Sequence, residues 1–126
     1  MSSIRVVNLA EKFSQIHEFY SPRIAGKINE FDVKLTKLKG EFMWHHHARE
    51  DEMFLVIAGT LRIKVREAGV EREHQVRPGE FIIIPHGIEH LPTPDDEVHI
   101  LLLEPHSTLN TGTEVNERTQ SKLETI

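Results

Sequence analysis

The chain has no cysteine among its 126 residues, so it can form no disulfide and offer no thiolate to a metal. Any metal it holds must be bound by nitrogen and oxygen. No apolar run approaches the roughly 18 residues that a membrane-spanning helix needs, which predicts that the protein has no membrane partner. Residues 1–5 also lack the charged and then apolar pattern of a signal peptide, so a cytoplasmic location is predicted.

The chain is also poor in positive charge. Its 15 Lys and Arg residues against 20 Asp and Glu residues give a net charge of −5, and the basic residues are scattered. Because nucleic acid is bound by clustered basic residues, no nucleic-acid partner is predicted. The length is sufficient for one hydrophobic core and too short for two ordinary domains, which predicts a single domain over residues 1–126.

Short strand-like runs separated by turn residues dominate the chain, with almost no helix between them. This pattern predicts an all-β antiparallel sandwich or barrel. Before the barrel, residues 4–7 form a weak strand candidate, and Asn8 can cap a short helix over residues 10–16. The barrel core is expected over about residues 24–104, followed by a strap or loose tail over 105–126. The predicted strands cover residues 24–28, 31–38, 42–47, 52–57, 61–66, 81–84 and 98–103.

Strand 31–38 alternates between apolar and polar residues, as a half-buried strand should. Phe31, Val33 and Leu35 share one face, and Asp32, Lys34 and Thr36 share the other. Lys34, Lys37 and Lys39 are expected to belong to a solvated face. Residues 67–73 read as a charged loop around Gly69, and Pro78-Gly79 as a turn.

Two runs, 53–57 and 81–84, are apolar on both faces. A barrel strand that faces water would not need a second apolar face, so the outer face should be covered by another sheet or a second subunit. We favour a homodimer.

Nine histidines is a high count for this length, and three of them are consecutive. In an extended strand, residues two apart point to the same side, so His45 and His47 can form a clamp for one metal while His46 faces away. Glu52 opens the next strand, close enough in sequence to bring its carboxylate beside the two rings. Nitrogen and carboxylate oxygen together suit several divalent first-row ions.

His90 is the best candidate for a fourth ligand, because the turn residues from Pro85 onward can swing the chain back across the barrel mouth. Three His and one Glu would leave open positions on an octahedral metal for substrate or oxygen. His86 and Glu89, near the same mouth, are weak candidates for catalytic proton carriers. No organic cofactor site is predicted.

Two spaced motifs resemble those of the cupin superfamily. The first has the form glycine, H-x-H, glutamate, glycine, and the second has the form glycine, proline, glycine, histidine. Their positions are Gly40, His45, His47, Glu52 and Gly59, then Gly79, Pro85, Gly87 and His90. The gap after Gly40 is one residue shorter than usual, and Pro94 replaces an asparagine that usually follows the second motif.

The chain is most similar to small single-domain bacterial cupins labelled mannose-6-phosphate-isomerase-like, which share runs such as Trp44–His47 and Leu109–Gly112. This resemblance implies a jelly-roll barrel of roughly six to eight strands, one divalent transition metal such as Zn, Fe, Mn or Ni, and commonly a dimer. It does not fix a reaction, because one fold hosts many functions.

Three functional hypotheses remain open. The protein is a metalloenzyme acting on a small oxygenated molecule, by Lewis-acid isomerase chemistry or as an Fe-dependent dioxygenase. Alternatively, it is a non-catalytic binding or sensing protein whose metal orients a small-molecule ligand. A purely structural metal is the third possibility, and it predicts a closed coordination shell.

Overall fold

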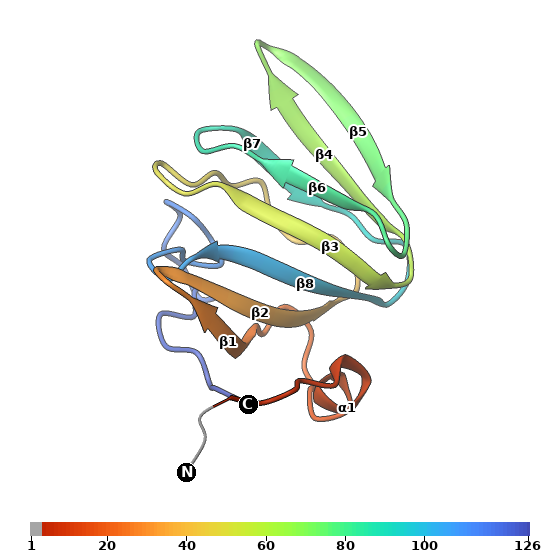
Figure 1. Cartoon of the computed structure of the whole chain (residues 1–126). Helices are drawn as coiled ribbons and strands as arrows, with labels where there is room; N and C mark the ends of the chain where they lie inside the picture. Colours follow the sequence, from red (N-terminus) through yellow and green to blue (C-terminus); the bar gives the residue numbers. More distant parts are fainter. Residues whose placement is uncertain (1–3) are drawn as a thin grey trace.

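A computed structural model describes residues 4–126 of the chain. Within these residues the fold is almost entirely β, as predicted, with one short helix before the strands (Figure 1). Every strand pairing is antiparallel. No helix in residues 4–126 is long and apolar enough to cross a membrane. The elements are α1 (Leu9–Phe13), β1 (Arg23–Ile28), β2 (Phe31–Leu38), β3 (Glu52–Ala58), β4 (Leu61–Glu67), β5 (Val70–Val76), β6 (Phe81–Ile84), β7 (Glu89–Pro92) and β8 (Val98–Pro105).

The strands form two sheets that face each other as a jelly roll. One sheet has five strands in the order β1-β2-β8-β3-β6, and the other has three in the order β5-β4-β7. Strands such as β2 and β8 are neighbours in the sheet although they are not consecutive in the sequence. Such crossover connections are typical of jelly rolls. The predicted hairpin of β1 and β2 is confirmed, with the turn at Asn29-Glu30.

The N-terminal region differs from the sequence-based expectation. Residues 4–8 contain no strand, and Val6 is 99% exposed, so the alternation there does not mark a buried face. The short helix is present and begins where predicted, because the Asn8 side chain accepts a hydrogen bond from the Glu11 backbone N–H at 2.9 Å. It ends at Phe13, sooner than expected.

Two strands were missed and one was predicted wrongly. β5 lies where a charged loop was expected, because its side chains are exposed up to Val76 and show no apolar alternation. β7 lies where only a turn was expected. Residues 42–47 contain no strand: His45 makes an isolated bridge to His90. The segment is nevertheless extended beside β7, since the Phe42 backbone N–H donates to the Pro92 carbonyl at 3.1 Å.

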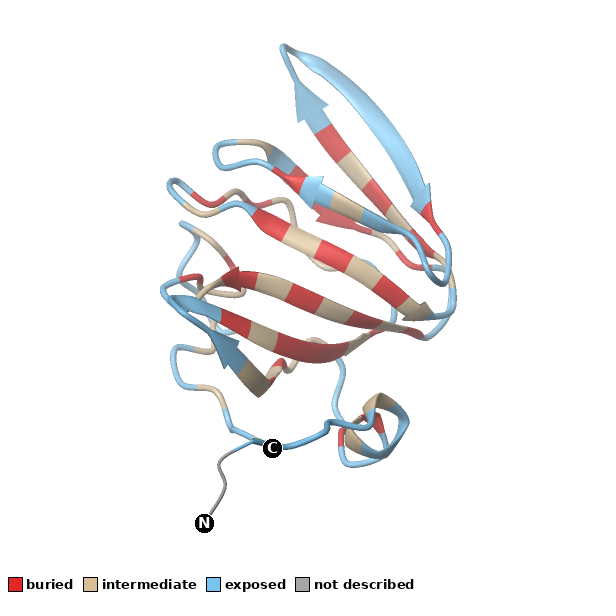
Figure 2. Ribbon diagram, viewed as in Figure 1, coloured by how far each residue is buried: buried red, intermediate tan, exposed pale blue. Residues whose placement is uncertain are grey.

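The main core lies between the sheets, and buried residues alternate with partly exposed ones along β3, β4 and β8 (Figure 2). It is built from Leu38, Phe54, Val56, Leu61, Ile63, Val65, Val76, Ile84, Val98, Ile100 and Leu102. A smaller cluster lies on the outer side of the five-stranded sheet, where Phe13 and Ile16 pack with Leu35. The helix region therefore covers part of that outer face.

β2 is buried on both faces, which corrects the expected solvated face. Asp32, Lys34 and Thr36 point into the barrel and are at most 2% exposed, while Leu35 is buried on the other side. The prediction for Lys34 was wrong because polarity was taken as a sign of solvent exposure. The polar interior instead provides one wall of a cavity.

Residues 106–126, here called the strap, contain no strand of the two sheets but lie against the barrel. The Thr113 backbone N–H donates to the His46 carbonyl at 3.1 Å, and the Ile126 N–H donates to the Ile24 carbonyl at 2.9 Å. Gly112 meets the His46 backbone so closely that an added Cβ would lie 2.8 Å from the His46 carbonyl carbon. The strap thus lies directly against residues 45–47, here called the histidine tract.

Candidate metal centre

The structure brings together four side chains that the sequence singled out. One potential ligand atom from each of His45, His47, Glu52 and His90 lies within 4.8 Å of the others, and all four residues are buried. They come from three places in the chain: the extended segment before β3, the first residue of β3, and β7.

Backbone hydrogen bonds hold these places together. His45 and His90 pair like strand residues, with N–H to carbonyl distances of 3.1 and 2.9 Å. The Gly87 N–H donates to the His47 carbonyl at 2.7 Å. Gly87 has φ +82°, a conformation that glycine adopts readily. Through this hydrogen bond, the turn of the second motif holds the segment that carries His45 and His47 in place.

Two of the rings are oriented by backbone carbonyls. The Nδ1 atoms of His45 and His90 lie 2.9 Å from the Met43 and Ile88 carbonyl oxygens, respectively. A ring that donates from Nδ1 keeps its lone pair on Nε2, which is the tautomer that binds metal through Nε2.

Within residues 4–126, several ring nitrogens and one carboxylate oxygen of the cluster lack the partners that buried polar atoms normally have. Both ring nitrogens of His47, Nε2 of His90 and Oε1 of Glu52 are buried without a hydrogen-bond partner within residues 4–126. The His47 Nε2 and His90 Nε2 atoms nevertheless lie 2.7 and 3.2 Å from Glu52 Oε1. Ring nitrogens and a carboxylate oxygen that converge in this way fit a bound cation.

The protonation states suit a metal as well. Burial, together with the neighbouring His90, lowers the pKa of His45 to about 4, so this imidazole is neutral at pH 7. Burial opposes ionisation of Glu52, but contacts from Glu104, His47 and His90 outweigh it and hold the pKa of Glu52 well below its usual range. Neutral imidazoles and a carboxylate are the forms that bind divalent ions.

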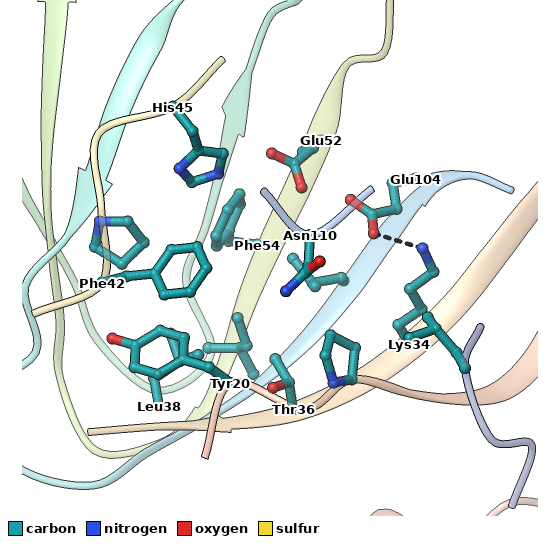
Figure 3. Close-up of a pocket in the computed structure, with 15 residues that line it drawn as sticks. Tyr20, Lys34, Thr36, Leu38, Phe42, His45, Glu52, Phe54, Glu104 and Asn110 are labelled. Carbon is teal, nitrogen blue, oxygen red and sulfur yellow. Dashed lines mark hydrogen bonds and ion pairs between the residues drawn. The ribbon is translucent and has the colours of Figure 1, made fainter. Parts of the chain in front are cut away.

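A cavity of about 50 Å³ adjoins the cluster (Figure 3). One wall is apolar, with the rings of Tyr20 and Phe42 stacked at 4.6 Å. The other carries Lys34 and Glu104, joined by a 2.8 Å ion pair. His45 and Glu52 line the same space, so ligand atoms of the candidate centre border a cavity that is apolar on one side and charged on the other.

Comparison with known proteins supports the family suggested by the motifs. Residues 34–104 match the model of the cupin domain, which is more than half of the chain. This chain is a member of the cupin family. The uncharacterized protein YdbB of Bacillus subtilis strain 168 is 30% identical over 88 residues, covering 68% of this cupin and 74% of that protein.

Solved structures agree with the fold. A cupin-2 domain containing protein from Shewanella frigidimarina is 40% identical, with a TM-score of 0.75 over 80% of this cupin and 95% of that chain. A hydroquinone 1,2-dioxygenase from Sphingomonas sp. TTNP3 has a TM-score of 0.71 at 19% identity, covering 80% of this cupin but 32% of its own chain. The latter likeness concerns the fold alone.

The two weak catalytic candidates lie away from the cavity of this cupin. The His86 side chain is 62% exposed, with Nδ1 2.9 Å from the Asp51 carboxylate, which also accepts the His86 backbone N–H. Glu89 is exposed on β7, with its carboxylate 3.7 Å from the Arg66 guanidinium. Neither residue lines the cavity beside the candidate metal ligands.

Sequence reasoning missed the charged wall of the cavity. Glu104 lies opposite Glu52 in the register of β8 and β3, since Met53 pairs with Leu103. Burial and the neighbouring Glu52 raise the pKa of Glu104 well above its usual range, although Lys34 acts in the opposite direction. The only sequence feature that pointed to this wall was a polar residue at every second position of β2. The pairing of β2 with β8 was needed to show that this polar face lies inside the barrel.

Proposed function

We propose that this cupin is a metalloenzyme that binds one divalent transition metal ion through His45, His47, Glu52 and His90. The observation that carries the proposal is the convergence of four buried ligand atoms, several of them without hydrogen-bond partners in the described chain. Zn, Fe, Mn and Ni all suit this ligand set. The ion would supply Lewis acidity or, as iron, oxygen chemistry for a small oxygenated substrate.

The cavity favours an enzyme over a passive binder. An enzyme needs a titratable group near the reacting atoms, whereas a purely apolar pocket would favour binding alone. Here the Glu104 carboxyl and the Lys34 ammonium line the space next to Glu52. The mannose-6-phosphate-isomerase-like resemblance and a dioxygenase reaction are both consistent with this arrangement.

A second candidate function is non-catalytic binding or sensing. The apolar wall favours it, because the rings of Phe42 and Phe54 lie in T-shaped contact with those of His45 and His90, respectively. In this alternative the ion orients a bound molecule that leaves unchanged.

Metal analysis tests the site. The parent and the variants His47→Ala, His90→Ala and His46→Ala are purified without added metal, and their metal content is measured. His46 is the matched control, because it belongs to the same tract but is not part of the ligand cluster. We expect about one equivalent in the parent and His46→Ala, and a large loss in the other two. Full retention by His47→Ala and His90→Ala would show that the ligand assignment is wrong.

Activity assays then separate the functions. Oxygen uptake and sugar-phosphate isomerisation are measured for the metal-loaded protein across a broad panel of small oxygenated molecules. Turnover in either assay supports the enzyme, and its complete absence alongside measurable ligand binding supports the binding protein.

We also propose a homodimer formed through the outer face of the five-stranded sheet. On the part of that face carried by β3 and β6, Met53 pairs with Ile83 and Leu55 with Phe81. Phe81 is 60% exposed and Ile83 54% exposed, so a contiguous apolar surface lies open beyond the part covered by α1. The cytoplasmic location stays a prediction.

A further inference from the structure

The buried lysine of the cavity has unused hydrogen-bonding capacity. Lys34 is 2% exposed, although removing an ammonium from water costs several kcal/mol. Its Nζ donates to Glu104 Oε1 at 2.8 Å and, weakly, to the Thr108 carbonyl at 3.4 Å. Because an ammonium has three N–H donors, one has no partner in the described chain.

The same wall carries a second buried polar group, the hydroxyl of Thr36. Thr36 is 2% exposed, and its Oγ1 makes no hydrogen bond with any residue the structure describes. It lies two residues from Lys34 on the same face of β2, and both side chains line the cavity. A buried polar group left unpaired costs about 1–3 kcal/mol, so this wall has donors ready for a ligand.

The charge of the cavity selects the sign of that ligand. With a divalent ion bound, the ion and Lys34 together carry more positive charge than Glu52 and Glu104 can balance, even when both of these side chains are ionised. An anion is therefore favoured, and its most natural place is beside the two free donors on β2. Since a single water needs roughly 10–15 Å³ of such volume, a cavity of about 50 Å³ favours a small anion over a large one.

We propose that the ligand of this cavity is a small hydroxy or oxo carboxylic acid whose carboxylate is bound by Lys34 and Thr36. Its other oxygen faces the metal ligands, and its carbon atoms lie against the apolar wall of Tyr20 and Phe42. The inference rests on the proposed function, because the second oxygen of the ligand is expected to contact the proposed metal ion. Lys34 is then the residue that selects an anion.

Calorimetric titration with matched acids and amides tests the inference. The probes are lactate and 3-hydroxybutyrate, each compared with its uncharged amide, titrated into the metal-loaded parent, Lys34→Met and Lys37→Met. Lys37 is the control, because it lies on β2 but does not line the cavity. Metal content and melting temperature are measured on the same samples.

We expect at least one acid to bind the parent about ten- to a hundredfold more tightly than its amide, as for a hydrogen bond to a charged group. Lys34→Met should lose this preference, and Lys37→Met should keep it. If Lys34→Met does not fold, the double variant Lys34→Met/Glu104→Gln, which leaves no unpaired charge, carries the same expectation.

The outcomes separate the two proposals. Equal affinity for acid and amide in the metal-loaded parent, binding of neither, or a preference that survives in Lys34→Met overturns the carboxylate inference and leaves the metal site standing. A parent that holds no metal overturns both.

Discussion

The contact between the strap and the histidine tract can be tested by adding one methyl group, in the variant Gly112→Ala. Gly112 has φ +61°, and a Cβ built there would lie 2.8 Å from the carbonyl carbon of His46 and closer still to its oxygen. This neighbour is backbone, so it cannot rotate aside. Gly112→Ala must therefore move either the strap or the tract that carries the candidate ligands His45 and His47.

The expected loss in the free energy of unfolding of Gly112→Ala has two contributions. A left-handed conformation costs an alanine about 1–2 kcal/mol relative to glycine. Overpacking against a fixed neighbour adds about 1–3 kcal/mol. Gly69→Ala isolates the first contribution, because Gly69 has φ +78° but nothing within 4 Å of an added Cβ. We expect Gly112→Ala to lower the free energy of unfolding by about 2–5 kcal/mol and Gly69→Ala by about 1–2 kcal/mol.

Urea unfolding of the metal-free proteins measures the stability difference, and competition with a chelator measures metal affinity. Supporting groups around a metal commonly change its affinity by about 10- to 100-fold, so we expect a loss of that order in Gly112→Ala and none in Gly69→Ala. Equal destabilisation of the two variants, with unchanged metal affinity in both, would show that the strap does not support the histidine tract.

Three further predictions concern other parts of the molecule. Tyr20 is the only tyrosine of the chain, and burial raises its pKa, so phenolate absorbance should appear at higher pH in the native protein than in urea. Its contribution to stability is complete below pH about 10 and is lost as the pH rises above that value, and equal titration midpoints would contradict this. Thr36→Val should raise the free energy of unfolding of the ligand-free protein by about 1 kcal/mol, because it removes a buried hydroxyl that has no partner among residues 4–126, and a clear loss of stability in urea unfolding would argue against this. Ile83→Glu should convert the proposed dimer to a monomer in light scattering without loss of fold, whereas the exposed control Val70→Glu on β5 should not.

The sequence was sufficient for the features that depend on short spacings. The β1–β2 hairpin followed from Asn29-Glu30 between two strand-like runs. The pair His45 and His47 followed from alternation in an extended segment, even though no strand forms there. The place of His90 followed from a turn that the second motif marks with Gly87.

Features that depend on distant pairings could not be predicted in this way. β5 has no buried face before Val76, so nothing in its pattern separates it from a charged loop. The contact of Gly112 with His46 joins residues far apart in the chain, and a single glycine in a polar segment is equally typical of an ordinary turn. The register that places Glu104 opposite Glu52 is likewise set only when β8 inserts between β2 and β3.

The wrong prediction for β2 concerns the wall of the barrel that lies beside the candidate metal centre. An interior wall built only for stability would be apolar, because a buried ion pair is often no more stabilising than hydrophobic residues of the same volume. This barrel instead buries Lys34 with Glu104 and leaves the Thr36 hydroxyl without a partner in the described chain. Such departures from local rules occur where function offsets their cost. Here they line the same cavity as the candidate ligands His45 and Glu52, so we infer that the polar face of β2 and the histidine tract serve one site.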